Sequence, residues 1–325
     1  MNLENRFMSF SSESKKVFTD ACKTSFTLFK IMIPVSIIVK ILIICGIVEI
    51  LAGYLSPVMN VVGLPGDFGL VWGTAMITNI YGGLIVFFNL SLANSYSVAQ
   101  VTVLATMMLI SHTFPIEVRI AQKAGVRARF TILFRFINAV IIGGILSFIF
   151  LYFNIFQEES KILWQPGITN PTLTQWGIGE LRNYAMIFLI IFSLLVLIRV
   201  LKNIGVIEKL NIALEPGLKF LGMSKNAAPL AIIGLTLGIS YGGGLIIREV
   251  KEKALSKKDA FLSLSMMGLL HSLIEDTILM LAIGASLVGI LFARIVFTIA
   301  IMVILIQIIN RASSKTFDRF FSKNN

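Results

Sequence analysis

The chain has 325 residues, of which 56% are hydrophobic and 14% are charged, with a formal net charge of +11. A soluble domain carries about a quarter charged residues, so this composition excludes a protein whose entire surface faces water. The positive charge would suit nucleic-acid binding, but the basic residues lie in short segments beside apolar runs, as orientation signals of membrane proteins do. We therefore predict a polytopic membrane protein with no nucleic-acid partner.

The predicted elements begin with residues 1–25, a polar amphipathic segment that we expect to lie in the cytoplasm or at the membrane interface. It shows no cleavable signal. Residues 26–44 then form an apolar run long enough to cross the bilayer, which takes roughly 20 residues. An amphipathic interfacial helix, a second apolar segment with glycines at its middle, and two further spans complete a first unit over residues 26–155. Residues 156–180 are predicted to be an extracytoplasmic linker, residues 181–311 a second unit, and residues 312–325 a cytoplasmic tail.

The second unit repeats the first. Sliding the sequence against itself by 159 residues superimposes the only two histidines of the chain, His112 and His271. Chance similarity between apolar sequences would match leucines rather than charges, yet charged residues coincide as well. The matched charged pairs are Glu49 with Glu208, Glu117 with Asp276, Lys40 with Arg199, and Arg135 with Arg294.

The distribution of basic residues predicts how the two units are oriented. If every basic segment lies in the cytoplasm, each unit has three spanning helices (one of them broken), an interfacial helix and a re-entrant hairpin. The two units then have inverted topology, a plan common among secondary transporters, and both termini are cytoplasmic. The alternative is eight crossings with parallel repeats, which would put residues 202–225 and 248–258 on opposite sides.

Two kinds of chain break indicate where a site forms. Adjacent glycines permit tight reversals, so we expect the hairpin tips at residues 79–83 (NIYGG) and 238–244 (GISYGGG), lining a cavity. The alternative is that these glycines only allow close helix packing. The second spans contain residues 111–117 (SHTFPIE) and 271–277 (HSLIEDT), where Pro115 predicts a kink or unwinding. Ionisable groups at this depth are costly and mark a site, a proton relay or a buried pair.

The candidate binding residues are the polar and glycine positions of these four breaks. Those of the first unit are Asn79, Tyr81, Gly82, Gly83, His112 and Glu117. Those of the second unit are Tyr241, Gly242, Gly243, Gly244, His271, Glu275, Asp276 and Thr277.

Their chemistry leaves several ligands open. His271 and Glu275 are four residues apart and are predicted to share one helical face. Two ligands are weak evidence for a metal, so we predict no metal site and no cofactor. The same groups suit H⁺, Na⁺ or the hydroxyls of a polar solute, or they pair only to hold the bundle together. Arg135 and Arg294 are expected to be interfacial or structural, and Trp72 an interface anchor.

The stretches at residues 240–250 (SYGGGLIIREV) and 271–277 resemble the Gate or "nucleoside recognition" domain family of bacterial membrane proteins. Residues 64–67 (LPGD) leading to Tyr81, Gly82 and Gly83 look like the same domain in the first unit. Related domains occur in concentrative nucleoside transporters, ferrous-iron transport B proteins and sporulation membrane proteins. The resemblance implies hairpins with mid-membrane tips beside interrupted helices. The chain has no P-loop, so it is not a whole iron transporter of that type.

These observations predict a secondary transporter of the cytoplasmic (inner) membrane that moves a small polar solute, nucleoside-like or other, coupled to H⁺ or Na⁺. Its partners would be membrane lipids and the solute, with a homo-oligomer left open. The alternative is a non-transporting scaffold or accessory protein of the sporulation type, whose polar residues would pair internally. We expect no enzyme, because no nucleophile–base set is present and the loops are too short to hold one.

Overall fold

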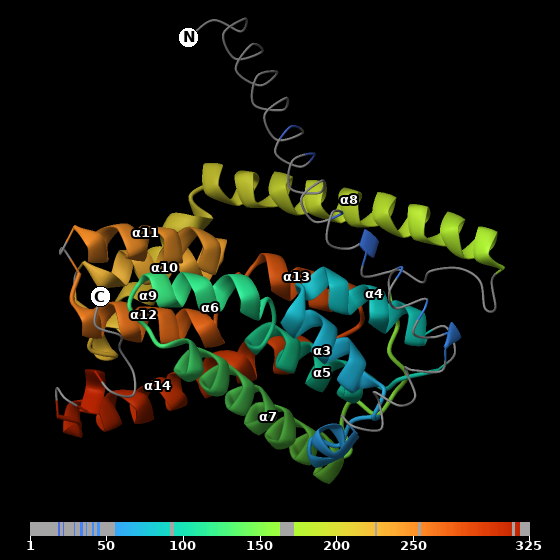
Figure 1. Cartoon of the computed structure of the whole chain (residues 1–325), viewed down its shortest axis with the longest axis horizontal. Helices are drawn as coiled ribbons and strands as arrows, with labels where there is room; N and C mark the ends of the chain where they lie inside the picture. The colour runs from blue at the N-terminus through green and yellow to red at the C-terminus, as the bar shows by residue number, and fades with distance from the viewer. Residues whose placement is uncertain are drawn as a thin grey trace, which may run out of the picture.

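The protein is an all-helical assembly in the computed structural model, which describes residues 56–91, 94–162, 172–224, 226–252, 255–313 and 316–318, with isolated positions between residues 19 and 45 (Figure 1). Within those residues no strand is formed, and one isolated bridge joins Ser97 to Glu159. The predicted first span, residues 26–44, lies outside the continuous described segments.

In the first half of the described chain residues 56–61 are helical, and the helices α3 to α7 follow. They are α3 (Phe68–Ile77), α4 (Ile80–Ser91), α5 (Val98–Ile110), α6 (Phe114–Lys123) and α7 (Ala128–Tyr152). The second half begins with the long helix α8 and ends with α14, which follows a π-helical turn, η1. Its elements are α8 (Leu173–Asn203), α9 (Val206–Phe220), α10 (Ala227–Leu237), α11 (Ile239–Lys251), α12 (Lys257–Leu269), α13 (Glu275–Ala282), η1 (Val288–Ala293) and α14 (Arg294–Arg311).

Three helical segments of the described chain are long and apolar enough to cross a membrane. They are Val98–Lys123, which combines α5 and α6, Ala128–Tyr152, and Val288–Arg311, which combines η1 and α14. The first is largely buried inside the protein, whereas α7 and α14 each expose a row of large apolar side chains. Exposed apolar faces of this size suit lipid rather than water.

Helix ends recur at positions 159 residues apart. Ser97 caps α5 by accepting a hydrogen bond from the Gln100 amide and forms a capping box with it, and Ser256 caps α12 by accepting from the Asp259 amide. The left-handed backbone positions recur as well, as single residues that reverse the chain after a helix. The pairs are Gly63 with Gly222 (φ 67° and 70°), Gly125 with Gly284 (91° and 88°), and Thr113 with Ser272 (52° and 48°).

The α3–α4 pair turns at Thr78 and Asn79 rather than at the glycines, which corrects the predicted position of the tip. Asn79 Oδ1 accepts a hydrogen bond from the Gly82 amide at 2.9 Å, and so helps to start α4. Gly82 and Gly83 are helical, and a Cβ on Gly83 would lie 2.7 Å from the Cβ of Ala75 on α3. The glycines therefore serve close packing of the two helices, which is the alternative interpretation of this motif.

The α10–α11 pair turns at Gly238, whose φ of 98° requires glycine. Tyr241, Gly242, Gly243 and Gly244 again lie inside a helix, α11, and the side chain of Tyr241 lies outside what the structure describes. The turn thus falls at the first residue of the predicted segment, residues 238–244, and the three consecutive glycines that follow are helical.

The connection from α4 to α5 is fixed to the start of α3. The Tyr96 hydroxyl donates to Asp67 Oδ2 at 2.9 Å. Burial and the charge of Asp67 raise the pKa of the Tyr96 phenol, so the donor proton stays in place. Trp72 lies at the centre of α3 and stacks on Phe136 of α7, with ring centroids 5.0 Å apart. The prediction that Trp72 anchors the membrane interface is therefore wrong.

The described helices form two hydrophobic cores, and each core takes residues from both halves, which meet along their broken helices. One core joins α3, α4, α5 and α7 with α13 and η1, and the other joins α10, α12 and α14 with the end of α6. Contacts between the halves run from α5 to α12, from α12 to α7, from α5 to η1, and from α6 to α11. In Figure 1 the α3–α4 and α10–α11 pairs lie on opposite sides of this meeting line, with α8 passing along one edge.

Candidate functional site

Two interrupted helices place the two histidines opposite one another. α5 ends at Ile110 and α6 begins at Phe114, so His112 lies in a non-helical step with Thr113 in the left-handed region. α12 ends at Leu269 and α13 begins at Glu275, and His271 lies in the equivalent step with Ser272 left-handed. The first break has Pro115 in the first turn of α6, where proline is tolerated; the second has no proline.

Both imidazole rings are held in the same orientation by the helix that precedes them. His112 Nδ1 lies 2.7 Å from the Met108 carbonyl oxygen, and His271 Nδ1 lies 2.7 Å from that of Met267. A carbonyl oxygen only accepts, so Nδ1 carries the proton in each ring. In the neutral rings both Nε2 atoms therefore present lone pairs, and they face each other at 3.3 Å.

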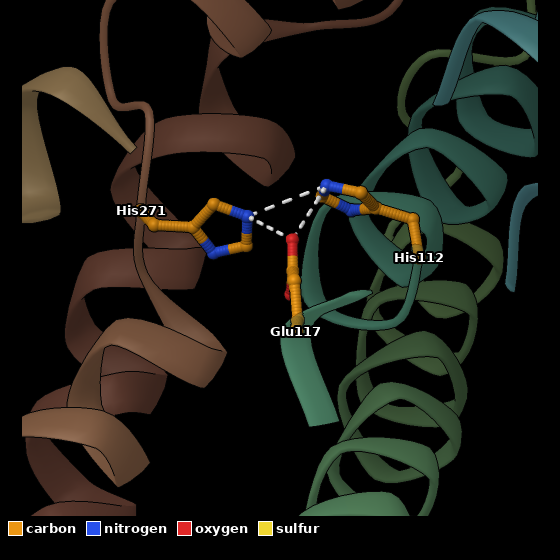
Figure 2. Close-up of side chains that lie close together, drawn as sticks. All are labelled: His112, Glu117 and His271. Carbon is orange, nitrogen blue, oxygen red and sulfur yellow. Dashed lines mark hydrogen bonds and ion pairs between the residues drawn. The ribbon is translucent and has the colours of Figure 1, made fainter. Parts of the chain in front are cut away.

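Glu117 adds a third acceptor at the same point. Its Oε1 lies 3.6 Å from His112 Nε2 and 3.4 Å from His271 Nε2. Figure 2 shows the carboxylate approaching between the two rings, which come from opposite sides. All three side chains are buried. Three buried acceptors without a donor repel one another, so this arrangement favours a cation or a proton at the point where they converge.

Two buried arginines hold the broken helices in place. Arg135 donates from Nε to the Ile110 carbonyl at 2.7 Å, from Nη2 to the His112 carbonyl at 3.1 Å, and from Nη1 to Glu117 Oε2. These bonds satisfy helix-end carbonyls that the break leaves without partners. The bond between Arg135 and Glu117 Oε2 also leaves the other carboxylate oxygen, Glu117 Oε1, facing the histidines.

Arg294 occupies the equivalent place in the second half. Its Nε donates to the Leu269 carbonyl at 2.9 Å, and its Nη2 to the His271 and Leu109 carbonyls at 3.2 Å. Arg135 and Arg294 are 1% and 0% exposed. The expectation that they are interfacial is therefore wrong, whereas a structural role for them is what the bonds describe.

The two halves differ at one carboxylate. Glu117 reaches its arginine, but Asp276, its counterpart with one methylene fewer, leaves Oδ2 without a hydrogen-bond partner among the described residues. Arg294 Nη1 is likewise buried without a described partner, as is Thr277 Oγ1. Asp276 and Arg294 remain within electrostatic range of each other and of Glu117. Unpaired buried groups are costly, so this corner is polar and incompletely satisfied.

Glu275 does not pair with His271 as predicted, because the break after α12 removes the helical spacing between them. Its Oε1 instead accepts a hydrogen bond from the Tyr81 hydroxyl at 3.3 Å, across the two halves. Helices α3 and α10 also contact the breaks through their backbones: the Thr113 amide donates to the Ala75 carbonyl of α3, and the Leu273 amide to the Leu235 carbonyl of α10, both at 2.9 Å. A Cβ on Gly238 would lie 2.8 Å from Ser272 Oγ.

The structure thus brings together most of the polar residues selected from the sequence. His112, Glu117 and His271 meet directly, Tyr81 and Glu275 meet beside them, and Asp276 lies close by. Asn79, Gly82 and Gly83 serve the turn and packing of the hairpin instead. Sequence reasoning missed Arg135 and Arg294 as parts of the centre, although they coincide under the same shift of 159 residues as the histidines.

Comparison with known proteins gives a family for the second half. Residues 184–291 match the family model named Gate, described as nucleoside recognition. The resemblance predicted from residues 240–250 and 271–277 is thereby confirmed. The first half lies outside this match, and its resemblance stays a prediction.

One curated relative extends over both halves. The chain is 27% identical over 281 residues to a protein of Bacillus subtilis (strain 168) described as the uncharacterized membrane protein YvoD, covering 84% of this chain and 87% of that protein. No solved structure matches the chain. With its three candidate spans, the protein is a membrane protein whose second half matches the Gate family model.

Proposed function

We propose that the protein is a cation-coupled secondary transporter of the cytoplasmic membrane, and that it carries a small polar solute with H⁺ or Na⁺ through the centre where its halves meet. The observation that carries this proposal is the convergence of His112, Glu117 and His271. Polar clusters buried between apolar helices are costly and mark ion or solute paths. This one needs a positive charge to neutralise its facing acceptors.

The unpaired corner beside the histidines supplies groups for a solute. Asp276 Oδ2, Thr277 Oγ1 and Arg294 Nη1 offer both acceptors and donors from buried positions. Hydroxyl and amide groups of a small polar molecule, such as a nucleoside, would satisfy them. The description of the matched family as nucleoside recognition agrees with this class of solute.

We further propose that the halves are inverted repeats, each with a re-entrant hairpin (α3–α4 or α10–α11) and a broken span. The support is that caps, left-handed residues and arginine bonds recur 159 residues apart. In Figure 1, α7 and α14 also end on opposite sides of the molecule. Inverted repeats around a midplane site are the usual basis of alternating access.

Orientation is tested by two exposed positions 159 residues apart, Arg129 and Val288. Each is changed to cysteine in a background with Cys22 and Cys45 replaced by serine, and intact cells are treated with a membrane-impermeant maleimide. Inverted repeats predict that only Val288→Cys reacts from outside. Labelling of both from the same side would favour the parallel arrangement.

Transport is tested in proteoliposomes that enclose a pH-sensitive dye, with a panel of nucleosides added outside and an imposed Na⁺ or H⁺ gradient. We expect solute-dependent cation movement, and its loss when Glu275→Gln and Asp276→Asn are combined. The exposed carboxylate of Glu252 provides the matched control, Glu252→Gln, which should transport normally. An unchanged response in the double variant would refute the assignment of these carboxylates.

The second candidate function is a non-transporting scaffold. One observation favours it: every member of the His112, Glu117, His271, Arg135 and Arg294 cluster is buried, as in a closed structural core. The unpaired atoms at Asp276, Thr277 and Arg294 count against it, because a scaffold has no need to leave them unsatisfied. Absence of any flux, with a stable folded protein, would favour the scaffold.

A further inference from the structure

We propose that the cation held by the two histidines and Glu117 is a divalent transition metal of the Zn²⁺ kind, bound in a three-ligand site shared by both halves. This adds a metal ion as a ligand of the same centre, beside the H⁺ or Na⁺ of the proposed function. Movement of the ion across the membrane rests on that function, but binding of the ion does not.

The three ligand atoms form a triangle of the size that a bound Zn²⁺ ion requires. His112 Nε2, His271 Nε2 and Glu117 Oε1 are separated by 3.3, 3.4 and 3.6 Å. Three atoms at these separations lie on a circle of radius about 2.0 Å, which is the length of a Zn–N or Zn–O bond. An ion at or just above the centre of the triangle therefore reaches all three atoms without any movement of the side chains.

The groups that orient the three ligands are already in place. A metal-bound histidine donates its other ring N–H to a carbonyl or carboxylate, which fixes its tautomer, and a bound carboxylate is itself hydrogen-bonded. His112 and His271 each direct Nδ1 to a backbone carbonyl at 2.7 Å, and Arg135 holds the second oxygen of Glu117. All three ligand atoms are thus oriented with their lone pairs free.

The donor atoms of this site determine which ions it selects. Two imidazole nitrogens and one carboxylate oxygen suit Zn²⁺, Fe²⁺, Co²⁺ or Ni²⁺, whereas Ca²⁺ and Mg²⁺ prefer oxygen ligands. Three protein ligands leave a tetrahedral ion with one open position. Such an incomplete sphere suits an ion that must also leave, because conduction requires binding that is not too strong.

The surrounding charges agree with a cation. Glu117, Glu275 and Asp276 provide three carboxylates around the centre, against the two guanidinium groups of Arg135 and Arg294. The Glu117 carboxylate oxygen that faces the two rings is nearest to the point where the ligands converge. An anion at that point would meet repulsion from this oxygen, and a metal ion attraction.

The site also joins segments that no single half could bring together. His112 lies in the break between α5 and α6, and Glu117 lies in the first turn of α6. His271 lies in the break between α12 and α13 of the second half. Binding of the ion would therefore tie the halves in this arrangement and stabilise the folded state by mass action. Withdrawal of His271 by movement of one half would leave only two ligands.

The test is Zn²⁺ binding to the chelator-treated protein in detergent, measured by isothermal titration and by the d–d absorption bands of Co²⁺. We expect one ion per chain and the spectrum of tetrahedral Co²⁺. Glu117→Gln should weaken binding at least about 100-fold, since losing even a supporting group costs 10–100-fold. This variant should fold, because its amide can accept from Arg135 and donate to the histidines.

Glu252→Gln, an exposed carboxylate change, should bind Zn²⁺ as the unaltered protein does. Absence of Zn²⁺ and Co²⁺ binding in the unaltered protein, or equal binding by Glu117→Gln, would overturn the metal site and leave a shared proton as the occupant. If the metal binds but neither it nor any solute crosses proteoliposomes, the metal site stands and the proposed transport fails. If H⁺-coupled solute uptake occurs without metal binding, the proposed transport stands and the metal site fails.

Discussion

Removing the charge of Arg135 should be far less harmful when Glu117 is neutralised at the same time. Arg135→Gln leaves the buried Glu117 carboxylate without its ion pair, and breaking one partner of a buried pair costs about 3–5 kcal/mol. The carbonyls of Ile110 and His112 also lose donors at 2.7 and 3.1 Å, which adds about 1 kcal/mol or more each. We expect a total of about 5–7 kcal/mol.

In the double variant with Glu117→Gln, no uncompensated charge remains and only the helix-end carbonyls are unsatisfied. The coupling between the two sites should therefore be about 2–3 kcal/mol, at the upper end for residues in contact. The free energies come from unfolding in mixed detergent micelles, monitored by circular dichroism. The exposed pair Arg248 and Glu249, whose atoms lie 3.0 Å apart, provides a control cycle with expected coupling below about 1 kcal/mol. Equal coupling in the two cycles would refute a buried, charge-carrying centre.

Four further variants, of which Gly144→Ala is a control, test packing and pairing in the same unfolding assay. Gly83→Ala should destabilise the protein by about 1–3 kcal/mol because its Cβ would clash with α3 and α5. Gly144→Ala, whose added Cβ would lie 4.0 Å from the nearest atom, should be neutral or stabilising by up to about 1 kcal/mol. A larger loss of stability in Gly144→Ala than in Gly83→Ala would contradict the packing. Asp276→Glu should bring the carboxylate to Arg294 and raise stability by about 1 kcal/mol, and no gain would show that the shorter side chain is not what keeps the pair apart. Tyr81→Phe should cost about 0.5–1.5 kcal/mol through loss of its hydrogen bond to the carboxylate on α13, and unchanged stability would show that this bond contributes nothing.

The sequence predicted the breaks better than the turns. Helix interruptions at His112 and His271 followed from clustered polar residues in otherwise apolar runs, because such residues are costly at membrane depth unless they form a site or a buried pair. Each predicted turn segment begins at the observed turn but continues too far into the following helix, because glycine signals both reversal and close packing. In the α3–α4 pair, the close approach of Gly83 to Ala75 shows that this glycine serves packing. In the first hairpin the reversal falls at Thr78 and Asn79, just before the glycine pair.

The composition of the centre could be predicted only in part. His112, His271 and Glu117 were selected one by one, but their meeting depends on how the halves pack, which spacing along one chain does not reveal. The helical rule paired His271 with Glu275 and failed because Ser272 adopts a left-handed backbone. Arg135 was assigned to the interface because basic residues near helix ends usually extend to water. Its burial requires three acceptors that the broken helix supplies from distant positions.

The central claim is that the polar corner beside the histidines opens in turn to each side of the membrane. Thr277 is buried, with its hydroxyl unpaired among the described residues, and Thr277→Cys preserves its size. In the background with Cys22 and Cys45 replaced by serine, this cysteine is exposed to a membrane-impermeant thiol reagent in right-side-out and in inverted vesicles. Thr106→Cys, at a buried and hydrogen-bonded position of α5, measures the background. The account predicts that Thr277→Cys reacts from both sides, with rates that change when the solute or Zn²⁺ is present, and reaction from neither side or from one side alone would contradict it.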